Sequence, residues 1–585
     1  MFLSIHKKME GLLMNKNHSG YRYSMGLLML FCLAAGSAWG QSAQDLPAEV
    51  IAYADIIFYN GKVLTADEEF TIEEALAIRD GKFLAVGSSE RILAMAGPKT
   101  RRVDLDGRSV IPGLIADHEH SAFVGNVAKR GQGGSLEFKD VASGLEEIKA
   151  EVAKFPPGLE LYMRGPSKKA LVLDVTLAQL DAAAPENPIS ISCQNNQVIV
   201  NSLMLKKLPP DMQGIVKDEN GNPTGQLRGA AAGTVIYEFM PQEDSSTQLE
   251  RQKETFRRYF SQGLTTIMGR GQGLTITILR DLWVKGELEP RVRIIHEFLR
   301  AQARPEAFLK RIGNLTDFGD DQLKIIGATV QVVDGSTGNG AALTDIPKIN
   351  RVEGDPYNTY GQNKWEETGN VATSDRQNII LANRYGWTIG GLHSAGDQSN
   401  SVLLEALHEA HQEKSLVGRH FGIDHQAMIR ESHFELMKEM DINPTMYASA
   451  ISGDNETWVY QYGADAVYNM TPARSVIDAG LKPAIEIPGG MEAIRAFVTR
   501  KSDDGRVWNP EQKVTRQEAL YMYTSWAARY SGEQDILGSI EVGKLGDLVV
   551  LGGDYMTWPE DELDALRVLM TVVGGNVVYE VRGAF

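Results

Sequence analysis

Cysteine is nearly absent from this sequence, which has Cys32 and Cys193 and no others in 585 residues. Cys32 lies in an N-terminal segment that we expect to be removed, which leaves one cysteine in the mature chain. A single cysteine cannot close an intramolecular disulfide, so packing has to stabilise the fold. The content of 43% hydrophobic and 23% charged residues is ordinary for a globular chain, and the length suffices for one large domain plus a smaller one.

Positive charge is also scarce. The chain has 59 Lys+Arg against 76 Asp+Glu, a formal net charge of −17, and no local basic patch stands out. A nucleic-acid partner requires such a patch to neutralise its phosphates, so we exclude nucleic acid. The glycine-rich stretch 335–340 lacks the Gly-Lys-Ser/Thr of a phosphate-binding loop and predicts only a flexible loop.

The apolar run near the N-terminus is shorter than the roughly 18 to 20 residues that a membrane-spanning helix needs. This run, residues 25–35, follows four basic residues between positions 7 and 22, and small residues precede Gln41. That order is typical of an export signal. We therefore predict that residues 1–40 are a signal peptide cleaved near Gln41. The mature chain would be periplasmic or secreted and would keep no stable membrane anchor.

Both ends of the remaining chain carry short apolar runs separated by turn signals. These runs are residues 55–59, 62–65, 75–78, 82–87, 546–551, 568–573 and 577–579. Asn60-Gly61 and Asp80-Gly81 lie between the first four runs and predict two antiparallel hairpins. We predict that residues 52–108 and 536–585 together build one small β-sandwich.

The middle of the chain alternates apolar, β-rich runs with helical stretches, which predicts an α/β fold with parallel strands. The eight candidate strands are residues 109–118, 264–268, 291–298, 323–333, 387–393, 421–425, 443–448 and 482–488. Eight such units favour a closed (β/α)8 barrel of the TIM type over residues 109–535. The segment 127–249 is too long for one crossover, so we interpret it as an insertion that caps the site.

Four of the 11 histidines end predicted strands. The apolar run from Ile111 ends in His118-Glu119-His120, whose two imidazoles share one face of the strand. Neutral imidazole is a common zinc ligand. Two surface histidines are the alternative, but a buried strand and the later strand ends at His393 and His425 favour a metal site. Barrel enzymes place their active residues at these C-terminal ends.

Other candidates are weaker. Arg270 follows the second barrel strand and either holds a substrate carboxylate or forms a structural ion pair. Trp365, Trp458, Tyr460 and Tyr462 lie in long connections and either line an aromatic pocket or pack the loops. His296 lies within an apolar strand and is interpreted as a core residue.

Several segments resemble the metal-dependent amidohydrolase superfamily. They are Asn60–Thr65, Val110–His120, His393–Asp397 and Gly538–Asp547. Gly221–Gly225 and Asp334-Gly335-Ser336 are similar to its amidohydrolase-3, YtcJ-like branch. The resemblance covers roughly residues 54–579. It implies a metal-bearing (β/α)8 barrel with a β-sandwich, and hydrolysis of amide or related C–N bonds.

The resemblance also implies roles for particular residues. His118 and His120 match the metal ligands of the first strand, and His393 and His425 match the histidines of the fifth and sixth strands. Three positions depart from the branch. Val330 stands where a carboxylated lysine bridges two metals, Glu486 stands where an aspartate is expected in the eighth strand, and Asn196 replaces a substrate-facing histidine.

Without a bridging carbamate, two nearby ions would repel each other, so we predict one divalent ion per chain, taken to be zinc. His118, His120 and His393 would hold it. Glu486 would take a proton from the activated water and pass it to the leaving nitrogen, or its extra methylene would make it a metal ligand. His425 would polarise the carbonyl oxygen or bind a second, weaker ion.

The leading hypothesis is therefore an exported, metal-dependent hydrolase that cleaves an amide, N-acyl or cyclic amide bond of a small molecule. One alternative is a metal-dependent lyase, isomerase or ester/lactone hydrolase on the same scaffold. Another is a non-catalytic binding or regulatory protein with a degenerate site. The sequence leaves open the substrate and whether the chain forms a homo-oligomer.

Overall fold

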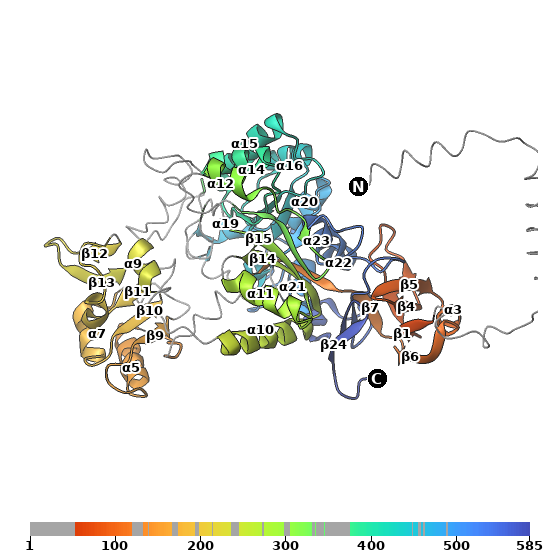
Figure 1. Ribbon diagram of the computed structural model, residues 1–585, viewed down its shortest axis with the longest axis horizontal. Coiled ribbons are helices and arrows are strands. Elements are labelled where there is room, and N and C mark those ends of the chain that lie inside the picture. Colours follow the sequence, from red (N-terminus) through yellow and green to blue (C-terminus); the bar gives the residue numbers. More distant parts are fainter. Residues whose placement is uncertain are drawn as a thin grey trace, which may run out of the picture. The chain divides into compact units, whose positions relative to one another are not determined.

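The computed structural model describes most of the chain from residue 53 to residue 585. The segments outside the described residues are 1–52, 120–132, 139, 166–173, 193–197, 213, 228, 236–244, 272–273, 298–304, 330–333, 335–343, 346–374, 447, 454–457, 460–461 and 487–488. By its contacts the chain divides after Ala54, and the elements below belong to the unit that runs from Asp55 to Phe585, apart from the first residue of β1. The fold is α/β (Figure 1).

Two mixed or antiparallel sheets collect strands from both ends of the chain. The four-stranded sheet has the order β5 (Lys82–Gly87), β4 (Ala75–Arg79), β1 (Ala54–Tyr59) and β6 (Ala96–Asp104). The six-stranded sheet has the order β24 (Asn576–Glu580), β23 (Val568–Val573), β22 (Leu548–Leu551), β7 (Ser109–Pro112), β2 (Lys62–Leu64) and β3 (Ile72–Glu73). Phe58 and Leu76 of the first sheet share one buried cluster with Val110 and Val550 of the second. The predicted pairing of residues 75–78 with 82–87 is confirmed.

The predicted hairpin at Asn60-Gly61 is wrong. The strands on either side of it, β1 and β2, lie in different sheets, because β1 pairs with β4 and β2 pairs with β3 and β7. Asn60 has φ +60° and supplies a sharp turn. A Cβ on Gly61 would lie 2.4 Å from Leu105 Cδ1, so the chain turns tightly against Leu105 and passes to the other sheet. The turn signal was real, but it does not determine which strand becomes the partner.

Two further sheets contain the eight strands that the sequence predicts in its middle part. The five-stranded sheet has the order β16 (Phe318–Gly319), β17 (Leu323–Ala328), β15 (Arg291–His296), β14 (Leu264–Gly271) and β8 (Leu114–Glu119). The four-stranded sheet has the order β18 (Leu392–His393), β19 (Gly422–Asp424), β20 (Asn443–Met446) and β21 (Ala484–Ile485). All neighbours pair in parallel except β16 with β17.

Backbone hydrogen bonds connect these two parallel sheets at both edges. At one edge Ala328 N donates to Thr388 O at 3.0 Å and Gly390 N donates to Ala328 O at 3.1 Å. At the other edge His118 N donates to Glu486 O at 3.3 Å. The strand ends after β8, β18, β19 and β21 therefore belong to one set of linked strands.

The predicted strand 109–118 is in fact two strands in two different sheets, β7 and β8. The chain changes sheet at Pro112-Gly113. A Cβ on Gly113 would lie 2.1 Å from Thr265 Oγ1, so only glycine fits where β7 gives way to β8 beside β14. Proline next to it limits further pairing, because it has no N–H to donate.

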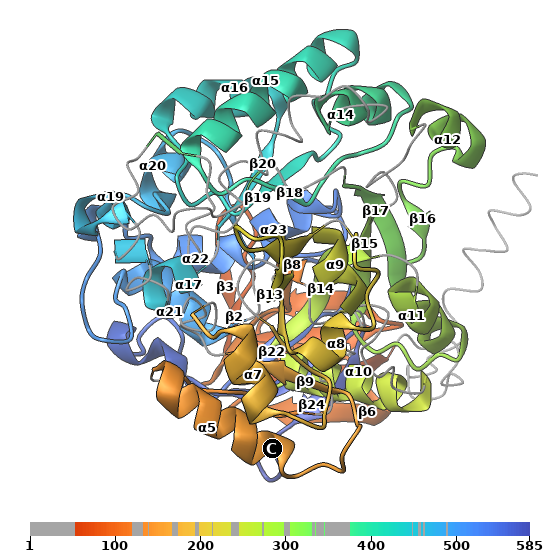
Figure 2. The ribbon, with the colours of Figure 1, turned by 90° about the vertical axis from the view of Figure 1, so that its left-hand side faces the viewer.

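Helices alternate with the parallel strands and pack against them. They are α10 (Ser245–Phe260), α11 (Leu274–Val284), α12 (Pro305–Ile312), α14 (Asp375–Arg384), α15 (Asp397–Glu413), α16 (Phe434–Met440), α17 (Ser449–Ser452), α19 (Ala464–Tyr468), α20 (Ala473–Asp478), α21 (Met491–Thr499), α22 (Arg516–Met522) and α23 (Ser525–Tyr530). Figure 2 shows α14, α15 and α16 along the strands β18 to β20. Ile267 and Ile423 of the strands share the main core with Leu279 of α11 and Leu404 of α15. In the described part of the chain, no helix is both long and apolar enough to cross a membrane.

Helix α23 packs on the other face of the strands. Its Ala527 and Tyr530 share a second buried cluster with Ile115 of β8, Met268 of β14 and Ala484 of β21. A Cβ on Gly422 would lie 2.2 Å from Tyr530 Cε2. The glycine in β19 therefore makes room for the tyrosine ring.

The segment predicted as an insertion forms a sheet of its own. Its elements are α5 (Val141–Val152), β9 (Leu161–Arg164), α7 (Leu177–Ala183), β10 (Ile189–Ser192), β11 (Val198–Val200), α8 (Ser202–Leu205), β12 (Ile215–Lys217), β13 (Pro223–Leu227) and α9 (Gly229–Thr234). The strand order is β12-β13-β11-β10-β9. Its buried side chains form two clusters, one with Ile148 and Ile191 and the other with Val200. That the segment caps the site stays a prediction.

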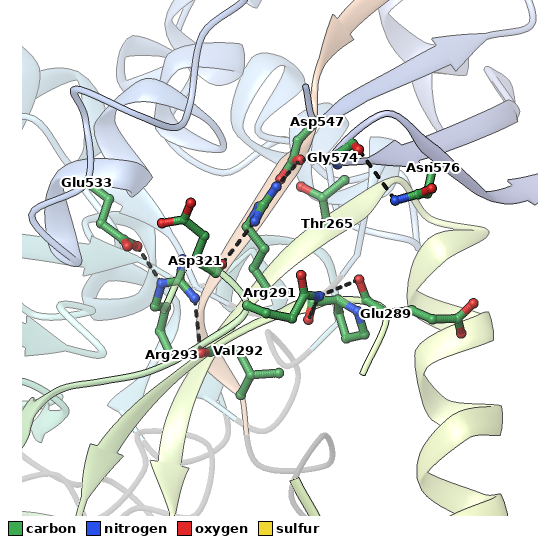
Figure 3. A network of polar contacts seen from close by, with 12 residues as sticks. Thr265, Glu289, Arg291, Val292, Arg293, Asp321, Glu533, Asp547, Gly574 and Asn576 are labelled. Atoms are coloured by element: carbon green, nitrogen blue, oxygen red, sulfur yellow. Dashed lines mark hydrogen bonds and ion pairs between the residues drawn. The ribbon is translucent and has the colours of Figure 1, made fainter. Parts of the chain in front are cut away.

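Buried ion pairs connect the beginnings of β15 and β17 to the C-terminal part of the chain. Figure 3 shows those of Arg291 and Arg293 on β15. Arg291 Nε and Nη2 donate to the two carboxylate oxygens of Asp547 at 2.7 and 2.8 Å. Arg293 Nε and Lys324 Nζ donate to the two oxygens of Glu533 at 2.5 and 2.7 Å. Lys324 is the second residue of β17 and therefore lies away from the C-terminal end of that strand.

Candidate functional site

Three of the four predicted histidines lie together. His118 is on β8, His393 ends β18, and His425 directly follows β19. The ring centroids of His118 and His425 are 4.4 Å apart, and those of His393 and His425 are 4.2 Å apart. Parallel strands bring their C-terminal ends to one edge of a sheet, which is why residues so distant in sequence meet here. His120 lies outside the described residues.

Each of these imidazoles turns Nδ1 toward a buried carboxylate. Nδ1 of His118 lies 2.5 Å from Asp424 Oδ2, and Nδ1 of His425 lies 2.7 Å from Glu486 Oε2. Nδ1 of His393 lies 3.5 Å from Asp334 Oδ1. The hydrogen-bonded carboxylates retain a proton on Nδ1 of His118 and His425, so that a neutral ring carries its lone pair on Nε2. Nδ1 of His393 faces Asp334 at a distance without a hydrogen bond.

Burial and neighbouring charges separate the pKa values of the three histidines. Burial and the charge of His425 lower the pKa of His393 to about 4. Burial also lowers the pKa of His118, although Asp424 opposes it. The pKa of His425 is raised, because the charge and hydrogen bond of Glu486 outweigh the effect of burial. At neutral pH, His118 and His393 are therefore neutral, which is the form that binds metals.

Asp424 connects His118 to two other buried side chains of the site. It is fully buried and accepts three hydrogen bonds, from His118 Nδ1, from Tyr530 Oη at 2.7 Å and from Arg270 Nη2 at 3.2 Å. Burial alone would raise its pKa, but His118 and Arg270 hold that pKa below the usual range. Arg270 therefore forms the structural ion pair that the sequence analysis considered, and its contact with substrate stays a prediction.

Glu486, the predicted base, is fully buried and lies against His425. Its Oε1 accepts hydrogen bonds from Thr445 Oγ1 at 2.7 Å and from the backbone N of His425. The carboxylate is thus held by two neighbouring strands. The longer side chain of glutamate reaches the ring of His425.

Asp334 shapes the loop that follows His393. Its Oδ1 accepts from Ala395 N at 2.9 Å, and its Oδ2 accepts from Gly396 N and Ser399 Oγ, both at 2.8 Å. These bonds fix the start of α15 directly after the histidine. The sequence pointed to Asp334 through its family motif, but not to this contact.

Some predicted residues cannot be placed. His120, Asn196, Trp365 and Val330 lie outside the described residues. Trp458 and Tyr462 are buried in an apolar cluster with Ala395. They pack the loops next to the site.

The donor chemistry of His118 and His393 fits a divalent ion, because both are neutral imidazoles with a carboxylate at Nδ1. Among the residues that the structure describes, no three His, Cys, Asp or Glu side chains are arranged as the ligands of one ion. The third predicted ligand, His120, is not among them.

Comparison with known proteins identifies relatives of nearly full length. Residues 101–579 match the amidohydrolase family model. The N-substituted formamide deformylase of Arthrobacter pascens is 24% identical over 570 residues, which cover 91% of this chain and 99% of that protein. The putative amidohydrolase YtcJ of Bacillus subtilis is 26% identical over 556 residues, which cover 90% of this chain and 99% of that protein.

Among solved structures, an uncharacterized metal-dependent hydrolase from Pyrococcus furiosus has the same fold. Its TM-score is 0.62 at 21% identity, over 86% of this chain and 100% of that chain.

Proposed function

The chain belongs to the amidohydrolase family, and from this premise we propose that it is an exported hydrolase that cleaves an amide, N-acyl or cyclic amide C–N bond of a small molecule. One observation carries the proposal. Three strand-end imidazoles meet, and each turns Nδ1 to a buried carboxylate. An arrangement that orients three buried histidines and keeps two of them neutral has little value for stability alone, and it is typical of catalytic metal sites.

We assign one divalent ion, zinc by the nature of its ligands, to His118, His120 and His393. The low pKa values of His118 and His393 support this assignment, because metal binding requires neutral imidazole. When bound, such an ion acts as a Lewis acid and lowers the pKa of water toward neutrality. A second ion has no bridging lysine, because position 330 is valine.

Glu486 and His425 form the proton-handling pair in this proposal. The charge of Glu486 keeps the pKa of His425 raised, so this imidazole holds a proton at neutral pH more readily than the other two. His425 can then donate a hydrogen bond to the carbonyl oxygen of the substrate. Glu486 takes the proton that water loses and returns it, through the pair, to the leaving nitrogen.

The architecture that supports this chemistry is part of the proposal. Strands β8, β14, β15, β17, β18, β19, β20 and β21 would close a (β/α)8 barrel over residues 109–535, with residues 127–249 as a cap. Hydrogen bonds at both edges of the two parallel sheets support closure. Residues 52–108 and 536–585 would form the β-sandwich, and residues 1–40 the export signal.

A substrate screen with and without metal tests the function. N-acyl amino acids, cyclic amides and lactones are offered to protein with its metal counted, to chelator-treated protein, and to chelator-treated protein with zinc restored. Turnover of an amide that chelation removes and zinc restores supports the proposal. Turnover of lactones alone supports an esterase, and no metal-dependent turnover of any compound contradicts an enzymatic site.

The variant Glu486→Gln tests the proton-handling pair separately. It should keep the ion and lose turnover, and full activity would remove Glu486 from the mechanism. Two tightly held ions per chain would contradict the single site. N-terminal sequencing of protein recovered from the periplasm would show whether the chain begins near Gln41.

A further inference from the structure

Asp424 connects parts of the chain that come from four separate elements. The acceptor itself ends β19, while its donors are His118 on β8, Arg270 on β14 and Tyr530 at the end of α23. Both carboxylate oxygens are used. Oδ1 accepts from Tyr530, and Oδ2 accepts from His118 and Arg270.

The direction of the hydrogen bond from Tyr530 follows from its other contact. The backbone N–H of Gly391 donates to Tyr530 Oη at 2.6 Å. A phenol has a single proton. Because the oxygen already accepts from Gly391, that proton is directed to Asp424 Oδ1. The tyrosine therefore requires an acceptor at the Oδ1 position.

The strands are adapted to this tyrosine. A Cβ on Gly422 would lie 2.2 Å from Tyr530 Cε2, and a Cβ on Gly390 would lie 3.3 Å from Tyr530 Cε1. The ring fills the space that these glycines leave in β19 and before β18. Its hydroxyl thus reaches Asp424, and through Asp424 it acts on His118.

The carboxylate determines which nitrogen of His118 carries the proton. With Nδ1–H donated to Asp424 Oδ2, a neutral ring has its lone pair on Nε2. The other tautomer would place a proton on Nε2 and remove that lone pair. If Asp424 only formed an ion pair with Arg270, its role would not depend on which nitrogen of His118 carries the proton.

We propose that Asp424 and Tyr530 are positioning residues, which together hold His118 as the tautomer with its lone pair on Nε2, ready to bind a divalent ion. The metal part of this inference rests on the proposed function. The tautomer part concerns the chain alone and can be measured in metal-free protein.

The substitution Asp424→Asn gives a sharp test, because the fixed proton of Tyr530 controls how the amide is oriented. Tyr530 donates at the Oδ1 position, whereas Arg270 Nη2 donates at the Oδ2 position, so all variants are compared in an Arg270→Met background, in which Tyr530 alone fixes the amide. The amide oxygen then occupies the Oδ1 position and the NH2 group faces His118. An NH2 group can only donate. Nδ1 of His118 must then accept, and the proton moves to Nε2.

Adding Tyr530→Phe should reverse this effect. Without the hydroxyl the amide can turn, present its oxygen to His118 and restore the proton to Nδ1. The double variant Asp424→Asn/Tyr530→Phe is thus expected to behave more like the wild type than Asp424→Asn does. A role in stability alone predicts the opposite order, because the double variant loses one more hydrogen bond.

The measurement is made on the full chain. Imidazole 15N chemical shifts in metal-free protein report the tautomer of His118, which is assigned by its loss in His118→Gln. Competition with a chromogenic chelator reports the affinity for zinc. We expect Asp424→Asn to change the tautomer and weaken zinc binding about 10- to 100-fold, as for other partners of metal-bound histidines, and the double variant to regain part of both.

Two variants serve as controls. Tyr555 is also fully buried and donates from its hydroxyl to a backbone carbonyl, that of Arg516 at 2.8 Å, so Tyr555→Phe should change stability but neither tautomer nor affinity. Glu533→Gln neutralises a buried carboxylate at the other end of the strands and should do the same.

The outcomes separate the inference from the proposed function. An unchanged tautomer in Asp424→Asn overturns the inference, as does a double variant further from the wild type than the single one. If the wild type binds no zinc, the proposed function fails, whereas the tautomer comparison still decides the role of Asp424. If Asp424→Asn does not fold, Tyr530→Phe alone should weaken zinc binding more than Tyr555→Phe, and equal effects would contradict the inference.

Discussion

The two ends of the parallel strands both contain buried charges, but they use them differently. At the N-terminal ends, Arg291 is paired with Asp547, and Arg293 and Lys324 share Glu533. Each carboxylate oxygen there accepts from a full cation. At the C-terminal ends, the carboxylates Asp334, Asp424 and Glu486 each face an imidazole, and Asp424 also accepts from an arginine, Arg270.

The C-terminal ends also contain buried polar atoms without hydrogen-bond partners. Within the described residues, neither carboxylate oxygen of the fully buried Asp117 has a hydrogen-bond partner, and neither has Nε of Arg270. Burial and the charges of Asp424 and Glu486 raise the pKa of Asp117 well above its usual range. Unsatisfied buried groups of this kind cost stability.

One set of strands thus carries two different arrangements of buried charge. Its N-terminal ends have satisfied ion pairs that connect the chain termini to the strands, and its C-terminal ends retain electrostatic stress next to the histidines. Perturbed groups concentrate at functional sites for this reason. Substitutions at the two ends should therefore separate turnover from stability.

The largest expected effect is the loss of turnover in His118→Ala. We expect the variant to bind no zinc and to lose its activity, because a proposed ligand of the ion is gone. The midpoint of thermal unfolding in chelator-treated protein should change little. Metal analysis, an activity assay and calorimetry measure the three quantities. The matched control is His408→Ala, because His408 is half-buried on α15 and lies outside the site. Retained zinc in His118→Ala would contradict a metal site at the C-terminal ends of the strands.

The second-largest expected effect is a loss of stability in Arg291→Ala, at the N-terminal ends of the strands. This change leaves Asp547 buried without its cation and should lower the free energy of unfolding by roughly 3–5 kcal/mol. Turnover per folded molecule at low temperature should remain that of the wild type. Denaturant unfolding and an activity assay on the same sample measure both. Arg384→Ala removes a half-exposed pair with Glu413 and should cost only about 0–1 kcal/mol. A loss of turnover in Arg291→Ala without unfolding would mean that the two ends are coupled.

The sequence predicts much of this arrangement, because strand periodicity and strand ends are local signals. Each of the eight predicted ranges overlaps one strand of the two parallel sheets, although β14 runs three residues beyond its range and the first range contains β7 as well as β8. His118, His393 and His425 lie together. Parallel pairing requires no knowledge of side-chain contacts once each strand is found.

What the sequence does not predict depends on long-range packing. Asn60-Gly61 indicates a turn but not its partner strand, and Gly113 is seen as a change of sheet only beside Thr265. Asp424 stands next to His425 and could have been suspected, whereas Tyr530 lies 106 residues away from it. No local pattern distinguishes that tyrosine from other buried ones.

A smaller effect concerns the pH dependence of stability at the functional end. His393 takes up its proton near pH 4 in the folded protein and near pH 6.5 in the unfolded chain. The unfolded state therefore binds more protons between these values, so the contribution of His393 is complete above pH 6.5 and falls as pH drops toward 4. The difference amounts to up to about 3 kcal/mol.

Calorimetry of chelator-treated protein from pH 7.5 to pH 4 measures this loss. In His393→Gln, which cannot titrate, the thermal midpoint should fall less steeply over the same range. The control is His408→Gln, which changes a half-buried histidine outside the site and should keep the slope of the wild type. Equal slopes in all three proteins would show that the low pKa of His393 does not hold in solution.

The smallest expected effect is that of Gly422→Ala, in β19, where the strand contacts Tyr530 of α23. The new methyl would lie 2.2 Å from the ring of Tyr530, so ring or strand must move, at roughly 1–3 kcal/mol. The same change at Gly390 meets that ring at 3.3 Å and should cost less. If Tyr530 connects α23 to the histidines, Gly422→Ala should also weaken zinc binding, because the displaced hydroxyl no longer holds Asp424. Arg291→Ala should leave zinc binding unchanged. Adding Tyr530→Leu should relieve the clash and restore stability without restoring zinc affinity. Recovery of both stability and zinc affinity would mean that the ring of Tyr530 serves packing alone. In that case α23 would contribute to stability and not to the histidine site.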